Sequence, residues 1–92
     1  MAAIMLIALP VRAADEDAAK SVELRLEGQC DAKNSRLWLV NNHGSKPIIA
    51  TLRWNLAGSK RVITEQFQVV PGGKLEIGCA AQADIVVAAF AP

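Results

Sequence analysis

Polar and apolar residues alternate along most of the chain beyond residue 20, and this pattern limits the fold more than any other feature of the sequence. The longest alternating run, 48–56, places Ile48, Ala50, Leu52, Trp54 and Leu56 on one side. Successive side chains of a β-strand point to opposite faces, whereas a helix would scatter these residues around its circumference. The pattern therefore predicts half-buried strands with one apolar face turned to a core.

Further runs with strand character are separated by residues typical of turns. The expected strands cover 21–27, 36–40, 48–56, 60–70, 74–79 and 84–90. The short turn Ala57-Gly58-Ser59 predicts that the third and fourth strands pair as a hairpin, and Pro71-Gly72 matches the central positions of a type II turn. No segment needs a helix. We predict an all-β domain, a sandwich or a small barrel, and of the two we favour the sandwich.

The first thirteen residues are typical of a secretory signal. Residues 1–10 form an almost unbroken apolar run, and Val11 and Ala13 suit the small-residue positions before a cleavage site, so we expect cleavage after Ala13. No Lys or Arg precedes the run, which is unusual for a signal. The alternatives are a short buried helix over residues 1–9, for which a domain of this size offers little room, or a retained membrane anchor, for which the run is short.

Cleavage would leave 79 residues, enough for one domain. Residues 14–19 are small and acidic, and we expect them to form a flexible solvated leader. The folded domain is then 20–92. A domain of this size buries only about 60–65% of its unfolded surface, so it gains from a covalent cross-link.

The chain has two cysteines, Cys30 in an expected loop and Cys79 in an expected strand, where alternation points its side chain inward. Export would place both thiols in an oxidising compartment, so we predict a Cys30–Cys79 disulfide; two buried free thiols are the alternative. Closing a loop of 49 residues would destabilise the unfolded chain by roughly 4 kcal/mol.

Charge and side-chain chemistry exclude several classes of function. Without the signal the chain carries nine basic and nine acidic residues, with no clustered basic face, so we do not expect nucleic-acid binding. We expect no cofactor and no metal, because His43 is the only histidine and a zinc site needs about four ligands. His43 lies in a glycine-containing turn two residues from Ser45, a spacing that strand or turn geometry does not readily make productive, and the carboxylates occupy solvent-facing positions, so we do not expect an enzyme.

From Leu37 to Cys79 the chain has a recognisable order of strands and turns. A strand ends in Asn41-Asn42 before Gly44, a long alternating strand follows, and a turn with Gly58 precedes Pro71-Gly72 and a strand closing on Cys79. This resembles the immunoglobulin-like and fibronectin-III-like modules of bacterial exported proteins, including the adhesion-related kind. The resemblance implies an immunoglobulin-like sandwich of about six to seven antiparallel strands. The chain departs from antibody domains in having no tyrosine and in placing Cys30 in a loop.

Trp38 is the candidate centre of a binding surface. If Leu37 and Leu39 point into the core, Trp38 lies on the opposite face together with Arg36 and Val40. Ile49 and Arg53 could extend that surface across a neighbouring strand. Aromatic and arginine side chains are favoured in interfaces. The alternatives are that Trp38 packs inside or that other residues cover the surface.

We therefore expect an exported binding or accessory module of the periplasm or the cell exterior, with no catalysis and no membrane anchor after cleavage. Its partner would be a protein or a component of the cell envelope. The alternative function is inhibition of a secreted enzyme by one of two turns, Asn41 to Lys46 or Ala57 to Arg61; Lys60 and Arg61 in the second turn would suit a trypsin-like protease.

Overall fold

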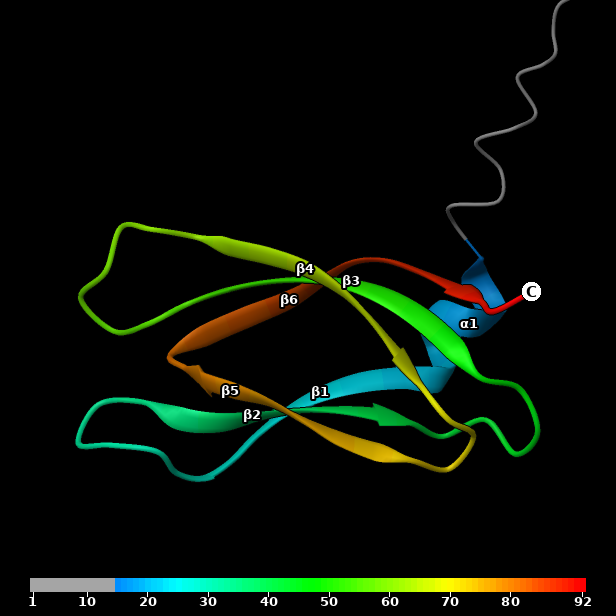
Figure 1. Ribbon diagram of the computed structural model, residues 1–92, viewed down its shortest axis with the longest axis horizontal. Coiled ribbons are helices and arrows are strands. Elements are labelled where there is room, and N and C mark those ends of the chain that lie inside the picture. The colour runs from blue at the N-terminus through cyan, green and yellow to red at the C-terminus, as the bar shows by residue number, and fades with distance from the viewer. Residues whose placement is uncertain (1–14) are drawn as a thin grey trace, which may run out of the picture.

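The protein folds into two antiparallel three-stranded sheets that lie against each other, with one short helix at one end (Figure 1). A computed structural model describes residues 15–92. The predicted signal, residues 1–13, lies outside them. Within 15–92 no helix has the length and apolar character needed to cross a membrane.

All six predicted strands are confirmed, with bounds shifted by a few residues at most. The strands are β1 (Val22–Gln29), β2 (Ser35–Asn41), β3 (Ile48–Asn55), β4 (Ile63–Val69), β5 (Lys74–Ala80) and β6 (Gln82–Phe90). One sheet has the order β1-β2-β5 and the other β4-β3-β6, so β2 and β3 are the central strands. Only Ala81 separates β5 from β6, and there the chain crosses from one sheet to the other.

The predicted hairpin of β3 and β4 is also confirmed. The two strands pair in one unbroken register from Ile48 opposite Val69 to Trp54 opposite Ile63. Gly58 in the connecting turn has φ +78°, a backbone conformation open to glycine at little steric cost. The predicted turn at Pro71-Gly72 likewise has Gly72 at φ +69°, and the Gly73 amide closes it by donating to the Val70 carbonyl at 2.9 Å.

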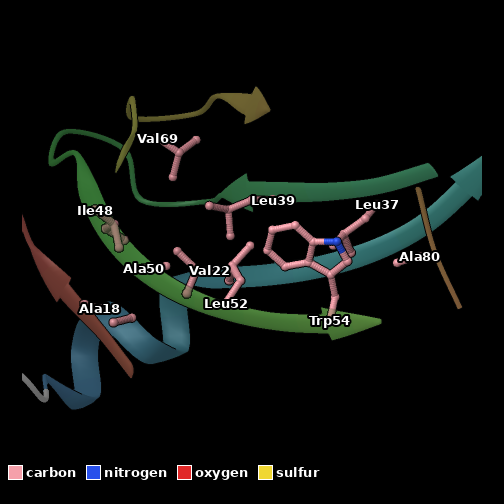
Figure 2. Close-up of a cluster of buried hydrophobic side chains, with 11 residues drawn as sticks. Ala18, Val22, Leu37, Leu39, Ile48, Ala50, Leu52, Trp54, Val69 and Ala80 are labelled. Atoms are coloured by element: carbon pink, nitrogen blue, oxygen red, sulfur yellow. The ribbon is translucent and has the colours of Figure 1, made fainter. Parts of the chain in front are cut away.

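The core lies between the inner faces of the central strands. Figure 2 shows Leu37 and Leu39 of β2 pointing toward Leu52 and Trp54 of β3. The leucines are fully buried and Trp54 is 7% exposed, with its ring 6.0 Å from that of Phe67. Alternation thus assigns the central strands correctly. It fails for Leu26, which lies at the register shift of β1, and for Leu56, which lies just beyond β3: they are 44% and 39% exposed.

The segment before β1 is a helix, α1 (Glu16–Ser21), so the prediction of a flexible leader over 14–19 and of a fold without helix is wrong for the described residues. The Asp15 carboxylate accepts hydrogen bonds from the Asp17 and Ala18 amides at 3.0 and 3.3 Å and caps the helix. Ala18 is fully buried in the core cluster. Residues 14–19 contain no large apolar side chain, but the methyl group of Ala18 suffices as an anchor because the helix packs against β6.

A β-bulge in β5 reverses the direction of Cys79, which the alternation placed inward. Leu37 pairs with Gly78 but the next residue, Trp38, pairs with Glu76, so Ile77 is an extra residue. Beyond the bulge, Cys79 lies opposite the exposed Arg36, and Ala80 is fully buried. Residues opposite each other in a ladder share a face, so Cys79 lies on the outer side of the sheet.

Candidate binding surface

The outer face of the β1-β2-β5 sheet is centred on Trp38. Strand alternation places Trp38 on the side opposite Leu37 and Leu39, both of which are buried. Its indole Nε1–H donates to the Glu27 carbonyl at 2.9 Å, and the Lys74 ammonium lies 4.6 Å from the ring centroid. The first contact fixes the ring plane and the second is a cation–π contact, so Trp38 is held in one orientation with part of its ring exposed.

Six charged side chains surround this ring. We call the group the Trp38 face: Glu23, Arg25 and Glu27 of β1, Arg36 and Trp38 of β2, and Lys74 and Glu76 of β5. Lys74 bonds the Glu27 carboxylate at 3.0 Å, Arg25 bonds Glu23 at 2.8 Å, and Arg36 approaches Glu76 at 3.9 Å. These side chains are between 40% and 52% exposed, so each pair contributes little to stability.

The hydrogen bonds around Glu23 favour the ionised form of its carboxyl group. The Arg25 side chain, and then the Asn42 amide, hold the pKa of the Glu23 carboxyl below its usual value, because both donate to the charged form. The same pair raises the pKa of Arg25. The face carries three acidic and three basic residues around one aromatic ring, so their formal charges balance.

The structure divides the predicted surface between two sheets. Arg36 and Trp38 lie together on the Trp38 face, and Val40 continues their row but is only 8% exposed, with Glu23 and Lys74 opposite it. Ile49 and Arg53 lie on β3. The expectation that they extend the Trp38 surface is wrong, because β2 and β3 belong to different sheets.

Arg53 instead belongs to a separate ion pair on the outer face of the β4-β3-β6 sheet. Its guanidinium bonds both oxygens of Asp84 on β6, at 2.8 and 3.3 Å. The two residues lie opposite each other in the ladder, and both are 53% exposed. The Arg53 guanidinium is therefore already paired closely with Asp84. It is less available to a partner than that of Arg36, whose nearest carboxylate oxygen lies 3.9 Å away.

The predicted disulfide between Cys30 and Cys79 is confirmed, with a Cα–Cα distance of 5.7 Å. Cys30 directly follows β1 and Cys79 lies in β5, so the bond connects the two edge strands that flank β2. It closes the end of the Trp38 face beyond Arg36. Unlike the disulfide of antibody domains it lies within one sheet and does not cross the core.

The turn from Asn41 to Lys46 is organised by buried and half-buried side chains. The fully buried Asn41 amide donates to the carbonyls of Lys46 and Val69 at 2.9 and 3.1 Å, and its oxygen accepts from the His43 amide at 2.8 Å. His43 Nδ1 accepts from the Ser45 and Lys46 amides. His43 therefore acts here as a local acceptor in the turn.

Sequence reasoning missed Glu27, Lys74 and Asn41. Lys74 and Glu27 are separated by 47 positions and meet only because β1 and β5 flank the same strand. The alternation does indicate that both side chains point outward. That they are neighbours follows only from the strand order. Asn41 ends an apolar run and begins a segment with turn character, so the sequence pattern does not indicate its burial.

Comparison of the chain with family models, with curated proteins and with solved structures finds no match. Among residues 15–92 no three His, Cys, Asp or Glu side chains gather as they would around a metal ion. On the Trp38 face an aromatic ring, paired charges and exposure coincide. An aromatic centre within a polar rim is the usual anatomy of a protein–protein contact.

Proposed function

We propose that the protein is an exported, non-catalytic binding module that contacts a protein or cell-envelope partner through the Trp38 face. The observation that carries the proposal is the arrangement of this face, where a partly exposed tryptophan is held by the Glu27 carbonyl and by Lys74. Tryptophan and arginine are enriched among the residues that dominate binding energy. Side chains already held in place lose little further freedom on binding.

Export is supported by the cysteine chemistry. A disulfide in a domain this small persists in the periplasm or outside the cell and is rare in a reducing cytosol. The signal-like residues 1–13 agree with this environment. Intact mass of the secreted or periplasmic product tests the proposal directly, because cleavage after Ala13 and loss of two hydrogens at the cysteines each give a defined mass.

We further propose that the two sheets form a sandwich of the immunoglobulin-like kind. The orders β1-β2-β5 and β4-β3-β6 correspond to strands A-B-E and C′-C-F of that architecture. The correspondence leaves strands D and G without a counterpart. Modules of this shape commonly act through their faces and loops, which agrees with a binding role but does not specify it.

Site-specific photo-cross-linking in the exporting cell tests the binding role. A photoreactive residue at position 36, exposed on the Trp38 face, should form adducts that a probe at exposed Gln82 on β6 does not. Trp38→Ala, which removes the centre of the face, should abolish the adducts while the fold is retained. Adducts that persist in Trp38→Ala, or that form equally from position 82, would count against this surface.

A second candidate function is inhibition of a secreted enzyme by the turn from Ala57 to Arg61. The Asn34 side chain accepts a hydrogen bond from the Ala57 amide at 2.8 Å, and Ser59 Oγ accepts from the Arg61 amide at 3.1 Å. These contacts hold Lys60 and Arg61, both exposed, on a supported turn. Inhibition of a trypsin-like protease that disappears in Lys60→Ala/Arg61→Ala would establish this function in place of the first.

A further inference from the structure

Three of the four edge strands have features that discourage pairing with another strand. β1 carries a register shift between Leu26 and Gln29 and a row of charged residues. β5 carries the bulge at Ile77 and the disulfide. β6 carries a register shift against β3, next to Thr51 of β3. Helix α1 covers the C-terminal part of β6, where the Asp15 amide donates to the Ala88 carbonyl. Bulges, charges and covering elements are the usual protection of sheet edges.

β4 is the unprotected edge. Its register with β3 is unbroken over seven residues, and within residues 15–92 it pairs with β3 alone. Glu65 is its one charged residue. Such an edge presents a row of backbone donors and acceptors to any extended segment that can reach it.

The outward residues along β4 and just beyond its ends are symmetric in character about Gln66. The outward row consists of Thr64, Gln66 and Gln68, opposite Arg53, Thr51 and Ile49 of β3. Alternation continues this row to Val62 and Val70. These two valines are 54% and 62% exposed, which makes them the most exposed large apolar residues of the described chain.

We infer that β4 pairs with β4 of a second copy of this chain, antiparallel and with a two-fold axis at Gln66. This register places Val62 of each copy opposite Val70 of the other and Thr64 opposite Gln68. On the inner face Ile63 lies opposite Val69, and Glu65 lies opposite Phe67. No like charges lie directly opposite each other, although the two Glu65 carboxylates are diagonal neighbours on the inner face, and both exposed valines gain an apolar neighbour.

Two further properties favour a second copy as the occupant of this edge. A two-fold contact uses the same patch on both partners, which requires a self-complementary strand. The domain's basic and acidic residues also balance, with nine of each from residue 15 onward, so no net charge drives the copies apart.

The dimer would present two Trp38 faces on one side. Because outward residues pair with outward residues, the two-fold axis is perpendicular to the joined six-stranded sheet, and both β1-β2-β5 sheets lie on the same side of it. A partner with repeated sites would then bind both copies at once. This consequence rests on the proposed binding role of the Trp38 face, whereas the self-association does not.

Sedimentation velocity of the oxidised protein, over a range of concentrations, tests the association without any partner. We expect a species of twice the monomer mass. Gln66→Lys and Gln66→Glu each place like charges at the axis and should weaken self-association at least about fivefold. An equimolar mixture of the two should associate as wild type does, which a folding defect would not allow. Gln82→Lys, the same change on the exposed part of β6, should have no effect.

Disulfide trapping tests the register. Gln66→Cys should form a covalent dimer under mild oxidation at least about tenfold faster than Thr64→Cys, because only residue 66 meets its own copy. A wild-type protein that remains monomeric at all concentrations overturns the inference, as does a mixture that fails to associate. Equal trapping of Thr64→Cys and Gln66→Cys overturns it too.

Discussion

Removal of the disulfide should bring the isolated domain close to unfolding. The bond between Cys30 and Cys79 closes a loop of 49 residues, and the chain-entropy relation for a loop of this length gives about 4 kcal/mol at 25 °C. A domain of this size has a free energy of unfolding of roughly 4–12 kcal/mol. The cross-link therefore accounts for a large part of the stability of the native state.

The effect should arise mainly in the unfolded chain. Cys30 directly follows β1 and Cys79 lies in β5, and β2 already holds both of these strands by hydrogen bonds. Loss of the sulfur–sulfur bond therefore changes native contacts little, while the denatured chain gains freedom to expand.

The assay is urea denaturation of wild type and of Cys30→Ala/Cys79→Ala, followed by tryptophan fluorescence. Trp54 is 7% exposed and should report loss of the core. The free energy of unfolding of the variant should be about 4 kcal/mol lower than that of wild type. In thermal denaturation its melting temperature should be lower by roughly 15–30 °C. Wild type under reducing conditions should match it. A loss below about 1 kcal/mol in both samples would refute the entropic reasoning, since the loop length gives about fourfold more.

Three other changes follow from single residues. Asn41→Ala leaves two carbonyls and one amide without their buried partner and should lower the free energy of unfolding by about 3 kcal/mol; an effect no larger than that of Asn42→Ala, a neighbour with an exposed side chain, would contradict this. Leu52→Ala should lower it by about 2–5 kcal/mol in urea denaturation, and Leu26→Ala by much less, because Leu26 is 44% exposed; equal losses would contradict the assignment of the core. Hydrogen bonds from the Lys33 amide, and then from Asn34, lower the pKa of Asp31. The contribution of this carboxylate to stability is therefore complete above its pKa in the unfolded chain, about 3.9, and is lost as the pH falls through its pKa in the folded protein. Asp31→Asn should therefore differ from wild type at pH 7 and converge with it near pH 2 in urea midpoints, whereas a constant difference would exclude the carboxylate as the cause.

The strands could be predicted because local pattern and tertiary position agree there. Every second residue of β3 is both apolar and covered by the other sheet, so alternation located the core from sequence. The disulfide followed from there being two cysteines. Helix α1 could not be found in this way, since its anchor is Ala18, whose burial depends on the close approach of β6.

The candidate site could be predicted only in part, because it depends on which strands are neighbours. Arg36 and Trp38 share one strand, and their common face follows from alternation. Glu27 and Lys74 lie on the same face as these two residues because β1 and β5 flank β2 in the sheet. Arg53 does not belong to this face because β3 lies in the other sheet. Strand order is set by long-range packing of the whole chain, which no local pattern contains.

Gly78 lies at the bulge in β5 that turns Cys79 outward and Ala80 into the core. Strict alternation through Leu75 and Ile77 would leave Cys79 inside and Ala80 outside. The extra residue of the bulge reverses both, and Gly78 has φ +155°, where an L side chain would be strained. Ala80 thereby stays in the core while Cys79 faces outward within reach of Cys30. A glycine directly before a cysteine in an alternating strand is thus a point where the pattern can change face, because the backbone there can accommodate the bulge that the cross-link requires.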